Sequence, residues 1–408
     1  MSENREFPPE LLNQSTKERL DYYSNKYFMP HPHLDNAFNS LKRHIQCCGD
    51  SRIVLITGPT GVGKTTLLEL TKNWVNEMAL PTLEAEKGCI PVADVEVTLQ
   101  KSGLFNPKDY LKRCLHALSE PENLIKHKID YGVRGISRND KGEIVIESRI
   151  LETELGWALE QALKQRHPHI FLIDEAHHLL SVASGRKLTD VPEAIKSLAN
   201  RTKVLHGLFG TYELLTLQDI GDQLSRRSLY IHIPRYSAEF IEDIEIWQSI
   251  VWSFQQHIPT DEEPDFLSHW QYLYERSLGC VGILKNWTSN ALGDALEENV
   301  KTVTLKHLEQ RALSVGQCQN ILKTIKEGEN RYAVIEGNVT NLQKELGLKS
   351  EPKSRADLIL DISYQEQLIS HQEQPKQQQE ITQPQKGRTD VGLRNPKRDQ
   401  VGIAKNAE

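Results

Sequence analysis

The chain has 408 residues, 38% of them hydrophobic and 26% charged, so it can bury one large core or two modest ones. It has no run of 18 apolar residues and opens on a polar stretch, so we expect a cytoplasmic protein that spans no membrane. Its six cysteines show no C-x-x-C pairing, which predicts reduced thiols and no zinc site. The net charge of −7 excludes a uniformly basic coat for nucleic acid, but it leaves room for a local basic groove.

The first part of the chain, residues 1–50, has the pattern of a polar helical segment followed by a linker. The string FMPHPH in this linker should lie extended just before a helix expected over Leu34–Cys47. Two interpretations of the linker are open. It packs on the adenine of a bound nucleotide, or it is a plain connection into the helix.

A nucleotide-binding motif follows the β-branched run Ile53–Thr57, which predicts a buried parallel strand. The string GPTGVGKT, Gly58–Thr65, fits G-x-x-x-x-G-K-[ST] at every fixed position, with a helical pattern after it. Its glycines let backbone N–H groups turn toward phosphates, Lys64 reaches the β- and γ-phosphates, and Thr65 ligates Mg²⁺. The flanking strand and helix disfavour the alternative, a plain Gly-rich turn. The expected nucleotide-binding residues are Gly58, Pro59, Thr60, Gly61, Val62, Gly63, Lys64, Thr65 and Thr66.

The next segment carries a basic insertion. A second buried strand is expected over Gly88–Val97 and a helix over Tyr110–Leu118, after which residues 119–150 predict a β-hairpin with a turn at NDKG. Residues 126–141 contain five Lys or Arg against two Asp, which indicates either a solvated loop or a DNA-facing element. In the second interpretation these side chains contact phosphates rather than base edges. The DNA-binding candidates are Lys101, Lys126, Lys128, Arg134 and Arg138.

Two acids end the third expected strand. A helix over Ile150–Gln165 precedes the apolar run that starts at His169 and ends in Asp174 and Glu175. Asp174 is placed to hold Mg²⁺ through water, and Glu175 to polarise the attacking water for hydrolysis. The pair lies about 110 residues after Lys64, an interval that accommodates an extra strand between the two motifs. Together with the phosphate-binding motif, the pair predicts an ATPase.

Polar residues also flank the last two expected strands, Val204–Phe209 and Leu229–Ile233. Thr211 follows the first of them, where it either senses the γ-phosphate or caps the helix after it. Arg226 and Arg227 precede the second, where an arginine finger would point into the ATP of a neighbouring subunit. The alternative for this pair is ordinary surface ion pairing. These strands complete an expected five-stranded α/β core over residues 51–235.

Residues 236–330 have the pattern of a small helical lid, and residues 331–408 that of a flexible tail. The lid helices are expected over Ala238–Gln256, Pro264–Ser277, Leu284–Asn299 and Thr304–Leu313. Lys285 opens one of these helices after a glycine-containing turn, which makes it a candidate phosphate sensor or a surface lysine. Within the tail, Lys349–Glu408 is Gln-rich and then basic, so it buries too little apolar area to order.

Five strings, in this order and spacing, resemble the AAA+ regulators of DNA transposition of the TnsC/TniB/MuB type, including those of CRISPR-associated transposons. They are GPTGVGKTTL, LIDEAHHL, GLFGTYELL, LSRRSLYIHIPRY and GCVGILKNW. The first two strings are general to P-loop ATPases, while DEAHH, GTYEL and RR…IPRY are more specific. The likeness covers roughly Phe28–Cys318, and it implies an AAA+ fold with a parallel five-stranded sheet, a C-terminal helical lid and a disordered tail.

The resemblance implies an ATPase that uses ATP and Mg²⁺ and assembles as a ring or filament on double-stranded DNA. The assembly would link a TniQ- or TnsD-like target selector to the transposase. The tail string GLRNPKRDQVG is similar to the C-terminal peptides with which such regulators engage transposase subunits. No acidic triad with nuclease or integrase spacing is evident, so strand chemistry would belong to a partner. The alternative is a signalling ATPase switch of the STAND type that does not act on DNA, while a small-molecule kinase fits poorly because Glu175 and the arginine pair suit hydrolysis at a subunit interface.

Overall fold

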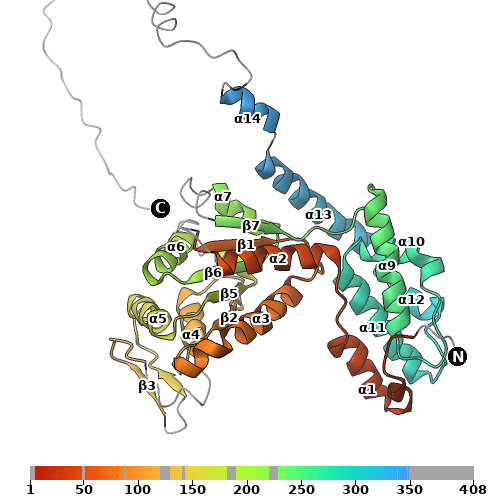
Figure 1. Ribbon diagram of the computed structural model, residues 1–408, viewed down its shortest axis with the longest axis horizontal. Helices are drawn as coiled ribbons and strands as arrows, with labels where there is room; N and C mark the ends of the chain where they lie inside the picture. Colours follow the sequence, from red (N-terminus) through yellow and green to blue (C-terminus); the bar gives the residue numbers. More distant parts are fainter. Residues whose placement is uncertain are drawn as a thin grey trace, which may run out of the picture. The chain divides into compact units, whose positions relative to one another are not determined.

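The structure is a computed structural model of the chain. It describes residues 5–47, 51–86, 88–119, 129–139, 143–181, 190–219, 228–337, 339–346 and 348. Two compact units divide the chain after Gly337, and the secondary structure up to helix α13 belongs to the first unit (Figure 1).

A five-stranded parallel sheet forms the centre of the first unit, as the sequence predicts. Its strands follow the order β2-β5-β6-β1-β7. Their bounds are β1 Ile53–Thr57, β2 Val92–Glu96, β5 Ile170–Asp174, β6 Leu205–Gly210 and β7 Ser228–His232. In the register of the sheet, Thr57 lies opposite Gly210 on one side and His232 on the other. Because all strands run the same way, the residues that follow β1, β5, β6 and β7 meet at one edge of the sheet.

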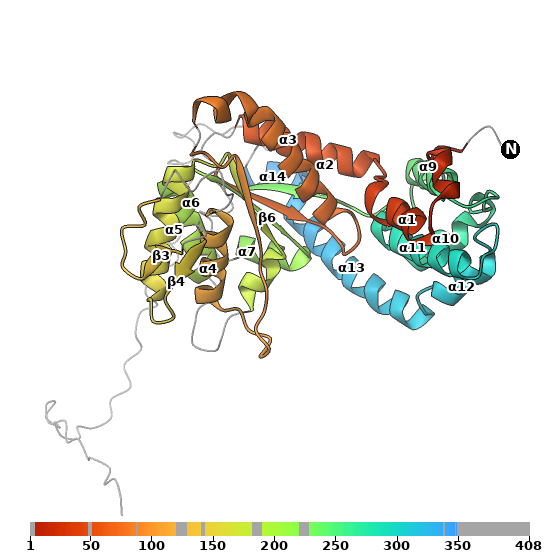
Figure 2. The same cartoon turned by 90° about the horizontal axis from the view of Figure 1, so that it is seen from below.

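Helices cover both faces of this sheet (Figure 2). They are α2 Pro32–Gln46, α3 Lys64–Ala85, α4 Pro107–Ala117, α5 Glu152–Arg166 and α6 Asp190–Thr202. Alternate residues of β1 point to opposite faces, so Leu55 packs in the core with residues of α4, α5 and α6. Val54 and Ile56 pack in the other core with residues of α2 and α3. Burial on both faces explains why β1 is apolar at successive positions.

The expected insertion hairpin is present, with β3 Ile136–Arg138 antiparallel to β4 Ile144–Ile146. Part of its turn, residues 140–142, lies outside the described residues. Short helices follow β5 and β6: η4 Ala176–Leu180, η5 Tyr212–Leu215 and α7 Thr216–Asp219.

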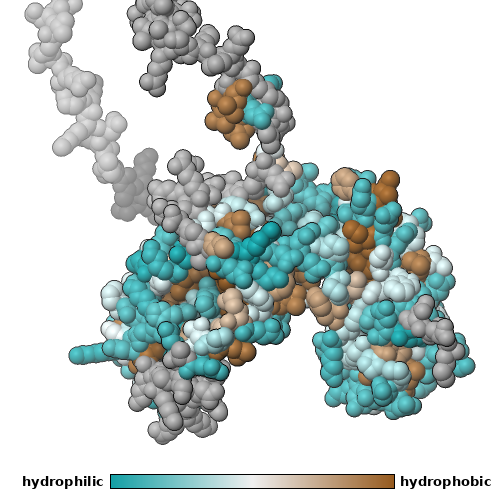
Figure 3. Space-filling view, in the orientation of Figure 1, coloured by the Kyte–Doolittle hydropathy of each residue, from teal (hydrophilic) through white to brown (hydrophobic). Residues whose placement is uncertain are grey.

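The lid has its own hydrophobic core, and the N-terminal segment contributes to it. The lid elements are α9 Ile241–His257, η6 Leu267–His269, α10 Trp270–Ser277, α11 Val281–Glu297 and α12 Leu305–Arg311. The N-terminal elements are η1 Pro9–Asn13, α1 Thr16–Asp21 and the π-helical turn η2 Tyr22–Lys26. Tyr23 is fully buried in the lid core, where its hydroxyl lies 2.9 Å from that of Thr288. Figure 2 shows α1 beside α11, and Figure 3 shows the surface hollowed between the sheet and the lid.

A long helix, α13 Val315–Glu336, is absent from our sequence-based expectations and continues past residue 330, where we expected the tail to begin. It packs on η5, and the Arg235 guanidinium donates to Glu329 over 2.9 Å. The second unit includes α14 Val339–Glu345, and the tail residues 349–408 lie outside the described residues.

Two further expectations concern the environment of the protein. Among the residues that the structure describes, every helix is too short or too polar to cross a bilayer. The cysteines in the described ranges, Cys47, Cys89, Cys114, Cys280 and Cys318, are free thiols.

Candidate functional site

The glycine-rich loop between β1 and α3 has the backbone of a phosphate-binding loop. Gly61 and Gly63 adopt φ of 82° and 102°, in the left-handed region that favours glycine. Gly63 is also the N-cap of α3, so the positive end of the helix dipole points into the loop. Backbone amides and a helix N-terminus together form an anion-binding cradle.

Lys64 turns back over this loop. Its ammonium donates to the carbonyl oxygens of Gly58 and Pro59, over 2.9 and 2.7 Å. Burial lowers the pKa of Lys64 to about 8, and the carboxylates of Glu175 and Asp174 oppose that shift. The loop therefore holds a half-buried cation where phosphate oxygens would replace two carbonyl contacts.

The two acids at the end of β5 lie where the sequence predicts them. The amide of Glu175 donates to Asp174 Oδ1 over 2.8 Å, and Glu175 Oε2 lies 3.2 Å from Nδ1 of His177. Glu175 has a φ of 49°, a left-handed conformation that is uncommon for a residue with a side chain. Burial raises the pKa of Asp174, and the charges of Glu175 and Glu96 raise it further. A divalent cation would favour the ionised form of such a carboxyl group.

Thr211 follows β6, the strand between β1 and β5. It is the N-cap residue of η5, yet its side chain makes no capping hydrogen bond. Its hydroxyl is buried and has no hydrogen-bond partner among the described residues. A buried hydroxyl without a partner is costly, so a ligand group in the adjacent cavity would stabilise it. This geometry favours the γ-phosphate role over the helix-cap role.

A cavity of about 460 Å³ joins these parts. Thr60–Thr66, Glu175 and Thr211 line it from the core. The N-terminal segment lines it as well, through Ser24, Asn25, Tyr27, Phe28, Met29, His31 and Leu34, and the lid through Val281, Gly282, Lys285 and Asn286. Of our two interpretations of the linker, this position favours packing against a nucleotide over a plain connection.

The lid touches the phosphate-binding loop directly. The amide of Gly282 donates to the carbonyl oxygen of Gly61 over 2.7 Å. A β-carbon at Gly282 would lie 2.7 Å from that same oxygen, so the approach requires glycine. Lys285 lines the cavity, but its ammonium donates to the carbonyl oxygen of Tyr27 over 2.6 Å. Our sequence analysis missed the Gly282–Gly61 contact because the two residues are far apart in the chain and neither forms a local motif with the other.

Other candidates are not part of this cavity. Lys101 and Arg134 lie on the surface of the α/β part of the chain, where both side chains are exposed. The Arg138 guanidinium donates to the Ser119 carbonyl oxygen over 3.4 Å. Four candidates lie outside the described residues: Lys126, Lys128, Arg226 and Arg227.

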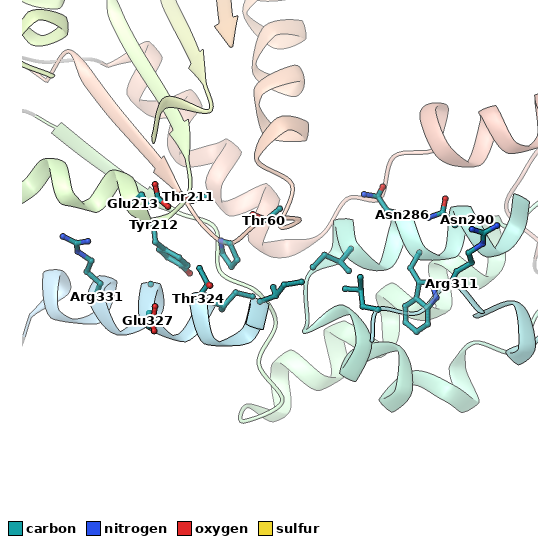
Figure 4. Close-up of a pocket in the computed structure, with 17 residues that line it drawn as sticks. Thr60, Thr211, Tyr212, Glu213, Asn286, Asn290, Arg311, Thr324, Glu327 and Arg331 are labelled. Atoms are coloured by element: carbon teal, nitrogen blue, oxygen red, sulfur yellow. The ribbon is translucent and has the colours of Figure 1, made fainter. Parts of the chain in front are cut away.

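A second cavity of about 710 Å³ adjoins the first, and Thr60, Thr211 and Asn286 line both. Figure 4 shows Thr324, Glu327 and Arg331 on α13, with the Tyr212 ring of η5 above that helix. A β-carbon at Gly328 would lie 2.0 Å from the Tyr212 ring, so α13 approaches η5 as closely as a glycine permits. Helix α13, which the sequence analysis did not predict, therefore lines the second cavity together with Thr211.

These groups fit a nucleoside triphosphate with Mg²⁺. The cradle of amides, the half-buried ammonium and the unpartnered hydroxyl all suit phosphate oxygens. The hydroxyl of Thr65 and the carboxyl group of Asp174 are oxygen donors, which Mg²⁺ prefers.

The comparison with protein families agrees with this geometry. Residues 48–218 match the family model described as "AAA domain". The α/β fold is accordingly of the AAA+ P-loop type, with its parallel sheet of five strands and its helical C-terminal part. No curated protein matches the sequence.

Several solved structures resemble the chain. The ORC2 protein of Aeropyrum pernix in its ADP form is 16% identical, with 71% of this chain and 70% of that chain covered and a TM-score of 0.44. The ORC1 protein of Aeropyrum pernix in complex with DNA is 16% identical, with 74% and 68% covered and a TM-score of 0.46. Domain III of the replication initiation protein DnaA from Thermotoga maritima is 14% identical, with 74% and 97% covered and a TM-score of 0.39.

Proposed function

We propose that the protein is an ATP-dependent, DNA-binding regulator of transposition. It binds ATP with Mg²⁺ in the 460 Å³ cavity, hydrolyses it, and assembles as a homo-oligomer on double-stranded DNA. The assembly links a TniQ- or TnsD-like target selector to the transposase. The observation that carries the ATPase part is the convergence of the P-loop, Glu175, Thr211 and the lid on one cavity. The transposition part rests on the order of the five sequence strings.

Each residue has a role in this proposal. Thr65 and Asp174 would hold Mg²⁺, which supplies charge neutralisation at the β- and γ-phosphates when bound. Lys64 and the loop amides orient the phosphates, Glu175 accepts a proton from the attacking water, and Thr211 orients the γ-phosphate or that water. Arg226 or Arg227 acts from the neighbouring subunit to offset charge in the transition state.

The pKa of Lys64 predicts a pH dependence of nucleotide binding. In the nucleotide-free protein this pKa is about 8, and contact with phosphate oxygens raises it because opposite charge favours the ammonium. Binding therefore takes up a proton above pH 8, and affinity for ADP or ATP should fall by about tenfold per pH unit there. Below pH 8 the ammonium is already charged, so the protonation of Lys64 should cause no further change in nucleotide affinity with pH.

Isothermal titration on both sides of pH 8, in two buffers of different ionisation enthalpy, measures affinity and proton uptake together. Because the pKa of Lys285 is also lowered to about 8 by burial, the titration is repeated with Lys285→Arg, which stays charged. Affinity and proton uptake that do not change with pH would contradict this assignment to Lys64.

The DNA-binding candidates predict a salt dependence. Lys101 and Arg134 are exposed, so we expect both to contact phosphates. Replacing both with alanine should lower the slope of log affinity against log salt by about two, with little change in sequence preference. The matched control replaces the exposed lysines Lys306 and Lys323. Arg138 is left intact because of its bond to Ser119, and an unchanged slope would place the DNA surface elsewhere.

The function as a whole is tested by deleting residues 386–408. We propose that this tail contacts the transposase, so the truncated protein should still assemble on duplex DNA with ATP in electron micrographs. It should no longer retain the transposase in a pull-down, because the arginines that would pair with acidic groups are gone. If the truncated protein retained the transposase fully, the tail would not be the transposase contact. If ATP-dependent assembly did not require DNA, a signalling switch would be favoured instead.

A further inference from the structure

The segment Tyr27–His31 links the lid-bound N-terminal helices to α2 and forms one wall of the nucleotide cavity. Phe28, Met29 and His31 line this wall, and residues of the phosphate-binding loop line the same cavity. An aromatic ring, a thioether and an imidazole offer an apolar surface with a polar edge, which suits a planar base more than it suits phosphates.

The segment is held at both ends. At one end the Tyr27 ring stacks on His257 of α9, with centroids 4.0 Å apart and an interplanar angle of 18°. At the other end Nδ1 of His31 lies 3.1 Å from the hydroxyl of Tyr236, and Nε2 lies 3.9 Å from the place of a β-carbon at Gly63. The His31 ring therefore reaches from the linker after β7 to the N-terminus of α3.

Lys285 ties the lid to this segment. Its ammonium donates to the Tyr27 carbonyl oxygen over 2.6 Å. It also lies 4.6 Å from the centroid of the Tyr27 ring and 5.3 Å from that of Tyr23, within the range of cation–π attraction. A hydrogen bond from a charged donor and two aromatic faces hold the ammonium against the N-terminal segment of the chain.

We propose that Lys285 is a positioning residue, which holds Tyr27–His31 against the base of the bound nucleotide. This inference rests on the proposed function, since it takes the cavity to bind ATP. Through Lys285 the lid would respond to the base, which ATP and ADP share, rather than to the γ-phosphate, which they do not. That differs from the phosphate-sensor role expected from the sequence, and the two roles predict different ligand profiles.

The test measures binding of three probes, ATP, ADP and inorganic tripolyphosphate, to Lys285→Met. A residue that positions the base wall should weaken ATP and ADP equally, by about tenfold, and leave tripolyphosphate unchanged because that probe has no base. A phosphate sensor should weaken ATP and tripolyphosphate and spare ADP, and that result would overturn the inference. Lys306→Met, at an exposed lid position, is the matched control and should change none of the three.

A second variant keeps the inference testable if Lys285→Met does not fold. Tyr27→Leu removes the ring while leaving the carbonyl acceptor, so it should produce the same profile with a smaller loss. In the double variant, the loss of ADP affinity should be less than the product of the two single losses, because the two changes disrupt one contact. Fully multiplicative losses would overturn the inference. Wild-type protein that binds tripolyphosphate but neither ATP nor ADP would overturn it too, whereas wild-type protein that binds none of the probes would overturn the proposed function itself.

Discussion

Replacing Lys64 with alanine should abolish binding of ATP and ADP at working concentrations. The ammonium makes two short contacts with loop carbonyls, and in the bound state it exchanges them for phosphate oxygens. Two hydrogen bonds from a charged donor contribute about 1.5–3 kcal/mol each, so their loss should weaken binding by about 10² to 10⁴-fold. The variant should fold, since the change removes a cation whose burial is unfavourable.

Thermal unfolding with and without nucleotide measures this effect. Ligand raises the midpoint of the wild-type protein because it binds the native state, and it should leave the midpoint of Lys64→Ala unchanged. Lys72→Ala is the matched control on the same helix. Lys72 pairs with Glu69 and Asp94 over 3.1 and 3.0 Å, outside the residues that line the cavity. A ligand shift of wild-type size in the Lys64 variant would rule out the phosphate-binding assignment.

The sheet and the residues at its edge are predictable because their signals are local. Each strand is a short apolar run, and the motif residues follow directly after β1 and β5. Helix ends are less predictable. The helix expected from Tyr110 begins at Pro107, because the Asn106 side chain accepts from the amides of Lys108 and Asp109 and caps it there.

Features that depend on contacts between residues distant in the chain leave no local sequence pattern from which they could be predicted. Helix α13 buries few side chains, Cys318 and Ile325 among them, and it packs on η5, which is distant from it in the chain. The N-terminal segment is placed by contacts such as Tyr23 with Thr288, which are 265 residues apart in the chain. Such contacts form from the tertiary arrangement, and no spacing within either segment encodes them.

Replacing Glu175 with glutamine should separate nucleotide binding from hydrolysis. Glutamine has nearly the same shape but is a far weaker base, so the attacking water loses its proton acceptor. Hydrolysis should fall by about 10² to 10⁴-fold, while ATP binding and ATP-dependent assembly on DNA persist. Binding should not weaken, because the change also removes a negative charge from the wall that faces the phosphates.

Phosphate release and nucleotide affinity, measured on the same preparation, distinguish this role from a general loss of charge. Glu213→Gln is the matched control, because Glu213 lines the second cavity and is absent from the lining of the first. We expect this control to hydrolyse ATP at close to the wild-type rate.

His177→Asn tests whether His177 holds Glu175 in place as the base. Nδ1 of His177 lies 3.2 Å from Glu175 Oε2, so the loss of His177 should reduce the rate of hydrolysis by less than Glu175→Gln does. Wild-type hydrolysis by Glu175→Gln would show that another group takes the proton, and Glu175 would then be a residue that shapes the turn after β5, where its φ of 49° already requires a defined backbone.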